Sequence, residues 1–334
     1  WLIVGQRQRS QITRPVRQLL RRGVDLVVGE AGEVDASQRL VRIGSEMIAY
    51  DLLVLASGAE MSFDSIPGLA AAQTFYTLDA ADRLGAALRY FSAGRVVIAV
   101  AGTPYKGPGA PYEAAMLLEH YFHTRRMRQN VEIELVTPEE RPLAYAGVAA
   151  GDLVLDLLAH KGIGFHGERH LATVNATRHE IVFSNGETGT FQLLIAIPEH
   201  RAPEVVVEAG LTDATGWIPV NRRTLETDYE DVYAIGDVTR YGLPDGTDLP
   251  MAGIFAEAQA IVVAKRIAHR INGGAAPGPF VPKGRGFVEV GGGAALMYDG
   301  DYAAVPRQIN LKQPSIAWHV AKKALERYWL WRWY

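Results

Sequence analysis

Two short motifs carry residue types that suit close contact with a bound cofactor. Residues 50–59 read Tyr-Asp-Leu-Leu-Val-Leu-Ala-Ser-Gly-Ala, an apolar strand that runs into a turn of small residues at Gly58. Residues 232–238 read Val-Tyr-Ala-Ile-Gly-Asp-Val, a second strand that ends in Gly236 and Asp237. A glycine lets the backbone approach a ligand closely, and a carboxylate accepts hydrogen bonds from hydroxyl groups. Taken singly, each motif also fits an ordinary buried strand that ends in a turn.

The segments between these motifs predict a parallel β-sheet with helical crossovers. We expect strands at residues 96–100, 131–136 and 193–197, with helices at 112–127 and 152–160 between them. The strands at 96–100 and 193–197 are continuous apolar runs, which is typical of strands that are buried on both faces. Strands that alternate with helices in this way indicate the α/β class.

The rest of the chain adds smaller elements. We expect a helix at 12–22 ended by Gly23, a β-meander at 25–28 and 39–43, a hairpin at 171–183, a helix at 254–271, a β-rich stretch at 280–311 and a final helix at 315–334. A length of 334 residues predicts two domains rather than one.

The composition excludes several classes of function. The chain has no cysteine, which excludes disulfide bonds, thiolate metal sites and a cysteine nucleophile. Its net charge of -3 argues against a broad basic surface for nucleic acid. His120 and His123 could share a helix face, but no third ligand is evident, so no metal site is predicted. No apolar run approaches the roughly 18 residues that cross a bilayer.

Taken together and in this order, the motifs resemble those of FAD-dependent oxidoreductases with two dinucleotide-binding domains, the pyridine nucleotide-disulfide oxidoreductase superfamily. The resemblance runs along nearly the whole chain. It implies an α/β fold of two Rossmann-like three-layer lobes, a C-terminal β-rich and helical interface segment, and FAD as the cofactor. It also implies that the N–H groups at the start of the helix near 254 face the flavin, where reduction deposits negative charge. The implied FAD contacts are Ser57, Gly58, Gly236, Asp237, Gly253, Ile254 and Phe255.

The resemblance also implies domain boundaries. The FAD-binding lobe would comprise residues 1–78 and 211–274, the second lobe residues 95–210, and the interface segment residues 275–334. The family normally opens with a strand–GxGxxG–helix unit that binds the FAD pyrophosphate, and no such unit precedes Trp1. We therefore expect an N-terminally truncated piece of an FAD protein, which binds FAD poorly or not at all by itself.

Three further stretches are similar to a narrower group, the sulfide:quinone oxidoreductase-like branch. They are residues 106–115, 250–259 and 284–289, and the aromatic C-terminus matches as well. Enzymes of this branch place cysteines beside the flavin to accept and pass on sulfur, and the matching positions here are Gly107 and Gly286. A glycine has no thiol for this chemistry. The resemblance therefore implies electron transfer from an unidentified donor through flavin to a quinone, without cysteine-based sulfide oxidation.

The second lobe lacks the usual signals for a nicotinamide cofactor. The loop after residue 101 reads Gly-Thr-Pro-Tyr-Lys-Gly-Pro-Gly-Ala-Pro, which does not fit GxGxxG and contains prolines that lack N–H donors. The strand at 131–136 ends in Thr-Pro, and Glu139 and Glu140 follow as weak substitutes for a ribose-binding acid. Met251 stands where the family often has a lysine near the flavin. Two alternatives stay open: an NAD(P)H-dependent flavoprotein reductase, and a degenerate scaffold without catalysis.

Three features point to catalysis and to partners. In the related fold, Glu113 would lie near the flavin and could relay protons, although a glutamate in a first helical turn also stabilises the helix. Phe287 is a candidate wall of the acceptor pocket. The final helix combines tryptophans with basic residues, which suits either a membrane interface or a homodimer contact. We expect a cytoplasmic protein that binds the inner face of the membrane peripherally.

Overall fold

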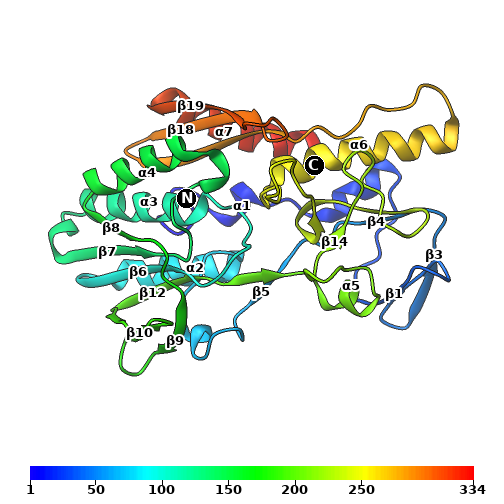
Figure 1. Ribbon diagram of the computed structural model, residues 1–334. Coiled ribbons are helices and arrows are strands. Elements are labelled where there is room, and N and C mark those ends of the chain that lie inside the picture. The colour runs from blue at the N-terminus through cyan, green and yellow to red at the C-terminus, as the bar shows by residue number, and fades with distance from the viewer.

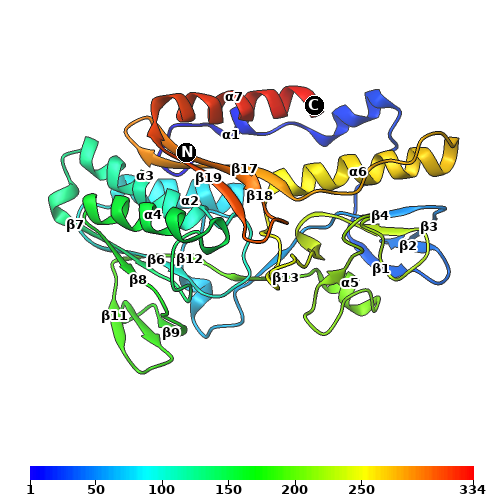
Figure 2. The ribbon, with the colours of Figure 1, turned by 45° about the horizontal axis from the view of Figure 1, so that its top comes forward.

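The computed structural model describes the backbone of residues 1–334 and every side chain except that of Arg21. Two lobes lie next to each other, and the C-terminal segment runs along one side of both (Figures 1 and 2). Strand β5 (Glu60–Ser62) pairs antiparallel with β13 (Glu199–Arg201) where the chain passes between the lobes. The α/β class predicted from the sequence is confirmed.

The second lobe is built on a four-stranded parallel sheet in the order β12-β6-β7-β8. Its strands are β6 (Gly94–Val100), β7 (Val131–Val136), β8 (Ile163–His166) and β12 (Leu193–Ile197), and its helices are α2 (Leu78–Tyr90), α3 (Ala110–Thr124) and α4 (Val148–His160). Two of the strands begin and end at the residues predicted. Most of both faces is buried, which explains the continuous apolar runs in β6 and β12, whereas Glu132 of β7 is exposed.

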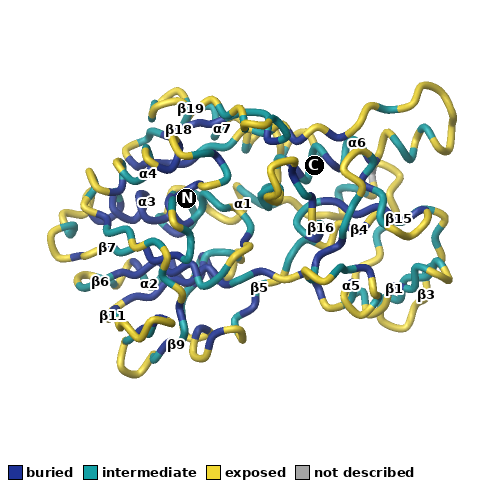
Figure 3. Tube along the Cα trace, viewed as in Figure 1, coloured by how far each residue is buried: buried dark blue, intermediate teal, exposed yellow. Residues whose placement is uncertain are grey.

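The two faces of this sheet are covered differently. The helices pack on the face that carries Val96, Ile98 and Val100. The opposite face carries Val97 and Ala99, and an antiparallel sheet packs against it. The strands of that sheet are β9 (Leu171–Asn175), β10 (Glu180–Phe183) and β11 (Thr188–Thr190). Figure 3 shows the buried backbone concentrated in these layers.

The first lobe brings together strands that are far apart in the sequence. Strand β4 (Leu53–Leu55) pairs parallel with β15 (Val232–Ala234), and β14 (Ile218–Pro219) pairs parallel with β16 (Thr239–Arg240). A meander of β1 (Ala31–Asp35), β2 (Leu40–Ile43) and β3 (Glu46–Ala49) lies beside them with helices α5 (Glu204–Glu208) and α6 (Gly253–Asn272).

The C-terminal segment is an antiparallel sheet followed by one long helix. It comprises β17 (Lys283–Gly291), β18 (Ala294–Asp301), β19 (Gln308–Ser315) and α7 (Ile316–Trp333). The sheet packs on α3 through residues such as Val288 and Leu296. Helix α7 lies over the sheet and beside the N-terminal residues (Figure 2). The β-rich stretch and the final helix predicted from the sequence are both present.

Two predicted elements near the N-terminus are wrong in detail. The helix expected at 12–22 is a short helix α1 (Arg9–Ile12) and a separate 3-10 helix η1 (Val16–Arg22), because the chain is extended at Pro15 between them. Gly23 does end η1, with a left-handed φ of 74°. The strand expected at 25–28 is absent, because these residues form no regular structure, and the first strand of the meander is β1. The Asp35 carboxylate accepts hydrogen bonds from the backbone of the following turn and so pairs β1 with β2.

Four further 3-10 turns complete the element list. They are η2 (Leu69–Ala71), η3 (Arg128–Asn130), η4 (Ala144–Ala146) and η5 (Gly236–Val238). Of these, η4 borders the candidate site, because Tyr145 lines the space between α3, α6 and the C-terminal sheet, and η5 packs against the start of α6.

Candidate functional site

The pairing of β4 with β15 brings the two sequence motifs to one edge of the first lobe. Leu55 lies opposite Ala234, so Ser57 and Gly58 follow one strand where Gly236 follows the other. Gly58 and Gly236 have φ values of 71° and 73°, which a glycine adopts without strain. A Cβ atom built on Gly58 would meet nothing within 4 Å. The backbone therefore borders open space there, as close contact with a cofactor requires.

Asp237 offers a free acceptor at this edge. Its carboxylate makes no hydrogen bond within the part of the chain that the structure describes, and burial raises its pKa although the charge of Lys106 lowers it. The preceding residue is fixed, since the Gly236 N–H donates to Gln259 Oε1 over 2.6 Å. Gln259 is itself buried on α6. A rigid turn with an unpaired carboxylate fits a polyhydroxyl chain such as the ribityl group.

The start of α6 provides unpaired backbone donors. The helix has 20 residues, and no side chain caps its N-terminus. The backbone N–H groups of Phe255 and Ala256 donate to the carbonyl oxygen of Ala252, one turn back. The N–H groups of Gly253 and Ile254 come earlier in the helix and have no acceptor within it. A Cβ atom on Gly253 would also meet nothing within 4 Å. Such a helix end attracts negative charge, and these residues fit a flavin at this place.

Three adjoining cavities meet beside α6. Their volumes are about 210, 500 and 920 Å³, and Ile254, Arg285 and Phe287 line all three. The smallest lies between α3 and the C-terminal sheet. The middle one lies between α6, α7 and the N-terminal residues and is walled mainly by apolar side chains. The largest lies between α7 and the outer face of the sheet. Phe287, the predicted pocket wall, therefore stands where the three cavities join.

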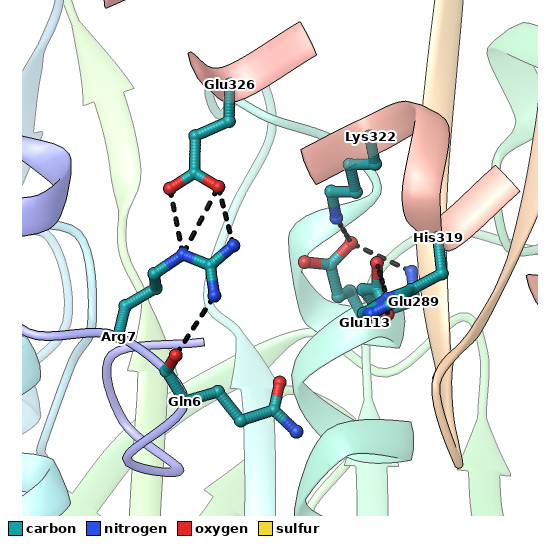
Figure 4. A network of polar contacts seen from close by, with 7 residues as sticks. All are labelled: Gln6, Arg7, Glu113, Glu289, His319, Lys322 and Glu326. Atoms are coloured by element: carbon teal, nitrogen blue, oxygen red, sulfur yellow. Dashed lines mark hydrogen bonds and ion pairs between the residues drawn. The ribbon is translucent and has the colours of Figure 1, made fainter. Parts of the chain in front are cut away.

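Glu113 belongs to a charged network that attaches α7 (Figure 4). Its Oε2 accepts hydrogen bonds from Lys322 Nζ and, over 3.0 Å, from the backbone N–H of Glu289. The Glu289 carboxylate is almost fully buried and lies 2.9 Å from Nδ1 of His319. Further along α7, Glu326 forms a bidentate ion pair with Arg7 of the N-terminal segment. Sequence analysis identified Glu113 but missed its partners.

The two positions that match family cysteines differ in their surroundings. Gly107 has a φ of 65°, and a Cβ atom there would touch only Ala110. A Cβ atom at Gly286 would overlap the phenol ring of Tyr298. The Tyr298 hydroxyl lies 2.7 Å from that of Tyr145, and burial raises the pKa of Tyr298 to about 12. Neutral phenols therefore fill the space beside Gly286.

Over the described residues, no cluster of three or more His, Asp or Glu side chains is arranged to hold a metal ion. The described helices include none with enough length and apolarity to span a bilayer. His120 packs beside Gly291, and His123 is exposed.

A family model now accounts for the fold and the two motifs together. The model described as pyridine nucleotide-disulphide oxidoreductase matches residues 4–260. The chain belongs to this family. FAD is accordingly its cofactor, as the sequence predicted, and the residues at the β4–β15 edge and the start of α6 fit that cofactor. The individual FAD contacts and the domain boundaries stay predictions.

Relatives and solved structures agree with the narrower resemblance. Mitochondrial sulfide:quinone oxidoreductase of Mus musculus is 25% identical over 255 residues, which are 72% of this chain and 56% of that protein. The Schizosaccharomyces pombe protein of the same name is 27% identical over 240 residues, 67% of this chain and 51% of its own. The chain thus spans about half the length of these curated relatives.

Among solved structures, the sulfide:quinone oxidoreductase of Aquifex aeolicus superimposes with a TM-score of 0.86 and 25% identity, covering 99% of this chain and 80% of that one. A ferredoxin reductase of Rhodopseudomonas palustris gives a TM-score of 0.64 at 22% identity, over 86% of this chain and 68% of its own, and shares the fold. The Rossmann-like α/β fold and the predicted family are confirmed.

The overlap between Gly286 and Tyr298 yields a testable prediction. We expect Gly286→Cys to lower the free energy of unfolding by about 2 kcal/mol, because the new side chain must displace a packed ring. The cost of Gly286→Cys should be smaller in a Tyr298→Ala background than in wild type, since the two changes share one space. Urea denaturation of wild type, both single variants and the double variant checks this. Gly278→Cys is the control, because a Cβ atom there meets nothing within 4 Å. Equal midpoints for Gly286→Cys and wild type would contradict the packing argument.

Proposed function

We propose that this flavoprotein passes electrons from a donor through FAD to a quinone, without cysteine-based sulfur chemistry. The observation that carries the proposal is the 500 Å³ cavity, which adjoins the start of α6 and is lined by Phe287, Leu325 and Trp329. A quinone ring is flat and apolar with polar carbonyl groups. Lys322 and Arg285 line the same cavity and can donate hydrogen bonds to such carbonyls. The relatives named for sulfide:quinone activity support the same acceptor.

In this proposal the chain positions the cofactor by three groups of residues. Ser57 and Gly58 close over it, and Gly236 and Asp237 hold its ribityl–phosphate chain. The start of α6, at Gly253, Ile254 and Phe255, stabilises negative charge on the reduced ring. FAD supplies two-electron redox chemistry when bound, and the protein orients it and tunes its surroundings. A longer form of the protein that also fails to bind FAD would favour the scaffold alternative.

Phe287 tests the acceptor cavity. In FAD-loaded protein reduced without oxygen, we expect Phe287→Ala to raise the concentration of decylubiquinone needed for half-maximal reoxidation about tenfold, because an apolar wall is lost. The flavin absorption spectrum should not change. Stopped-flow absorbance measures the reoxidation. Tyr90→Ala, at an exposed site on α2, is the control. If wild-type protein fails to reduce the quinone, the proposed acceptor is wrong.

Glu113 is proposed to hold a proton for this reaction. Its carboxylate lines the 210 Å³ cavity, and its ion-pair partner Lys322 lines the 500 Å³ cavity. Conversion of a quinone to a quinol consumes two electrons and two protons. The ion pair therefore offers a path for protons between the two cavities, in addition to the stabilisation that Glu113 gives to the first turn of α3.

This role predicts a selective kinetic defect. We expect Glu113→Gln to slow quinone reduction about 100-fold and to change its pH profile, because an amide cannot pass on a proton. Glu113→Asp should restore part of the rate. Glu119→Gln breaks a different ion pair on the same helix, with Lys161, and should leave the rate unchanged. A pH profile for Glu113→Gln that matches wild type would leave Glu113 a structural role alone.

We also propose that the protein is cytoplasmic and binds the inner face of the membrane peripherally through α7. The helix has no buried residue. Its polar side chains Lys322 and Glu326 contact the body of the protein, while Ile316, Val320 and Trp331 are 68%, 57% and 77% exposed. Tryptophan and aliphatic residues beside basic ones are typical of helices that lie in a membrane interface. The same surface would also serve a homodimer.

Vesicle flotation distinguishes these two uses of α7. We expect the double variant Ile316→Glu, Trp331→Glu to bind vesicles of phosphatidylcholine and phosphatidylglycerol at least about tenfold more weakly than wild type, because charged side chains resist burial in lipid. Tyr90→Glu is the control, because Tyr90 on α2 is also highly exposed, at 88%. Unchanged binding would refute the membrane role, and a shift from dimer to monomer in sedimentation would assign the surface to self-association.

A further inference from the structure

The second lobe has a place where a nicotinamide dinucleotide would bind. A Rossmann-like lobe holds its dinucleotide over the carboxyl ends of the strands, with the pyrophosphate at the helix that follows the first strand and the ribose at an acid after the second. Here these positions are the loop from β6 to α3 and the residues after β7. Glu139 is the first acidic residue beyond β7.

The Glu139 carboxylate is occupied by the protein itself. Its Oε2 accepts hydrogen bonds from the hydroxyls of Tyr105 and Tyr112, each over 2.7 Å, and a weaker one from Thr137 Oγ1 over 3.3 Å. Tyr105 is 5% exposed and Tyr112 is fully buried. Burial raises the pKa of both tyrosines, so both remain neutral donors at neutral pH. One of the two carboxylate oxygens that could accept a ribose hydroxyl therefore already has its donors.

The loop before α3 is closed in the same way. The N–H of Gly107 donates to the carbonyl oxygen of Met251 over 2.8 Å, and the N–H of Ala110 donates to that of Gly107. A Cβ atom on Gly102 would lie 2.9 Å from Glu199, so the loop packs directly on β13. Pro111 in the first turn has no N–H. Few backbone donors at this helix start are left for a pyrophosphate.

The charge at the start of α3 also disfavours a bound pyrophosphate. Glu113 stands in the first turn of α3, where a pyrophosphate would need positive surroundings. Lys322 pairs with Glu113 from α7, and the charge of Lys106 acts on Asp237 and His200. The helix end that binds a phosphate group in a dinucleotide-binding lobe therefore carries a carboxylate here.

We propose that Tyr105, Tyr112 and Glu139 form a lock that closes the second lobe to NADH and NADPH and thereby sets the class of electron donor. Tyr105 supplies the ring that fills the loop, and Glu139 holds both tyrosines in place. The lobe then serves as a rigid support for the loop at Gly107 and for α3. This inference rests on the proposed function in one respect: it specifies which donors the proposed oxidoreductase rejects.

Titration calorimetry with NADH and with ADP-ribose tests the lock on the full chain, with and without added FAD. We expect wild type to show no binding below about 1 mM ligand, and Tyr105→Ala to bind ADP-ribose at least about tenfold more tightly than wild type. Tyr105→Phe keeps the ring and should stay closed. Circular dichroism confirms that each variant is folded, and Tyr105→Leu replaces Tyr105→Ala if the latter does not fold.

Two outcomes overturn the lock. One is saturable binding of NADH to wild type. The other is a folded Tyr105→Ala or Tyr105→Leu variant that binds ADP-ribose no better than wild type. Both are binding results that need no electron transfer, so they are separate from a failure of the proposed function, which would appear as reduced flavin that does not reduce decylubiquinone.

Discussion

The candidate site depends on the parallel pairing of β4 with β15. Two parallel strands cannot be joined by a tight turn, so the chain must leave the first lobe after β4 and return before β15. The whole second lobe is built during that excursion. Since both strands point the same way, the turns that follow them, at Gly58 and Gly236, lie at one edge and next to the start of α6. The register of three residue pairs thus fixes where a cofactor can bind.

The attachment of α7 explains why cavities exist beside that edge. A helix that packs through apolar side chains normally excludes space between itself and its support. Helix α7 instead reaches the body through long polar side chains, above all Lys322 to Glu113 and His319 to Glu289. Small residues such as Ala321 and Ala324 line the largest cavity beneath it. Because the buried Glu289 carboxylate is costly without a partner, His319 fixes where the helix sits.

Local patterns sufficed for the parts of the fold that are governed by burial. Strand β12 follows directly from a continuous apolar run, since a strand covered on both faces has no polar position, whereas β7 keeps Glu132 at an exposed position. The single helix predicted at 12–22 is wrong because the prediction relied on the spacing of the apolar residues and gave too little weight to Pro15, which interrupts the helix. The glycines and Asp237 could be proposed from their motifs. The partners of Glu113 and Glu139 could not, because Lys322 and Tyr105 come from distant parts of the chain and nothing local marks the contacts.

The same physical device recurs at two places where a family feature is missing. Beside Gly286 the space of a side chain is taken by Tyr298, and after β7 the acceptor oxygen of Glu139 is taken by Tyr105 and Tyr112. In each case a phenol supplies both volume and a hydrogen-bond donor, so the interior stays packed and polar groups stay satisfied. An electron donor for the proposed reaction must therefore transfer its electrons without reacting with a cysteine of the protein. Given the proposed lock, it must also do so without binding in the dinucleotide cleft of the second lobe. The remaining route runs through the junction of the cavities, where Ile254, Arg285 and Phe287 meet.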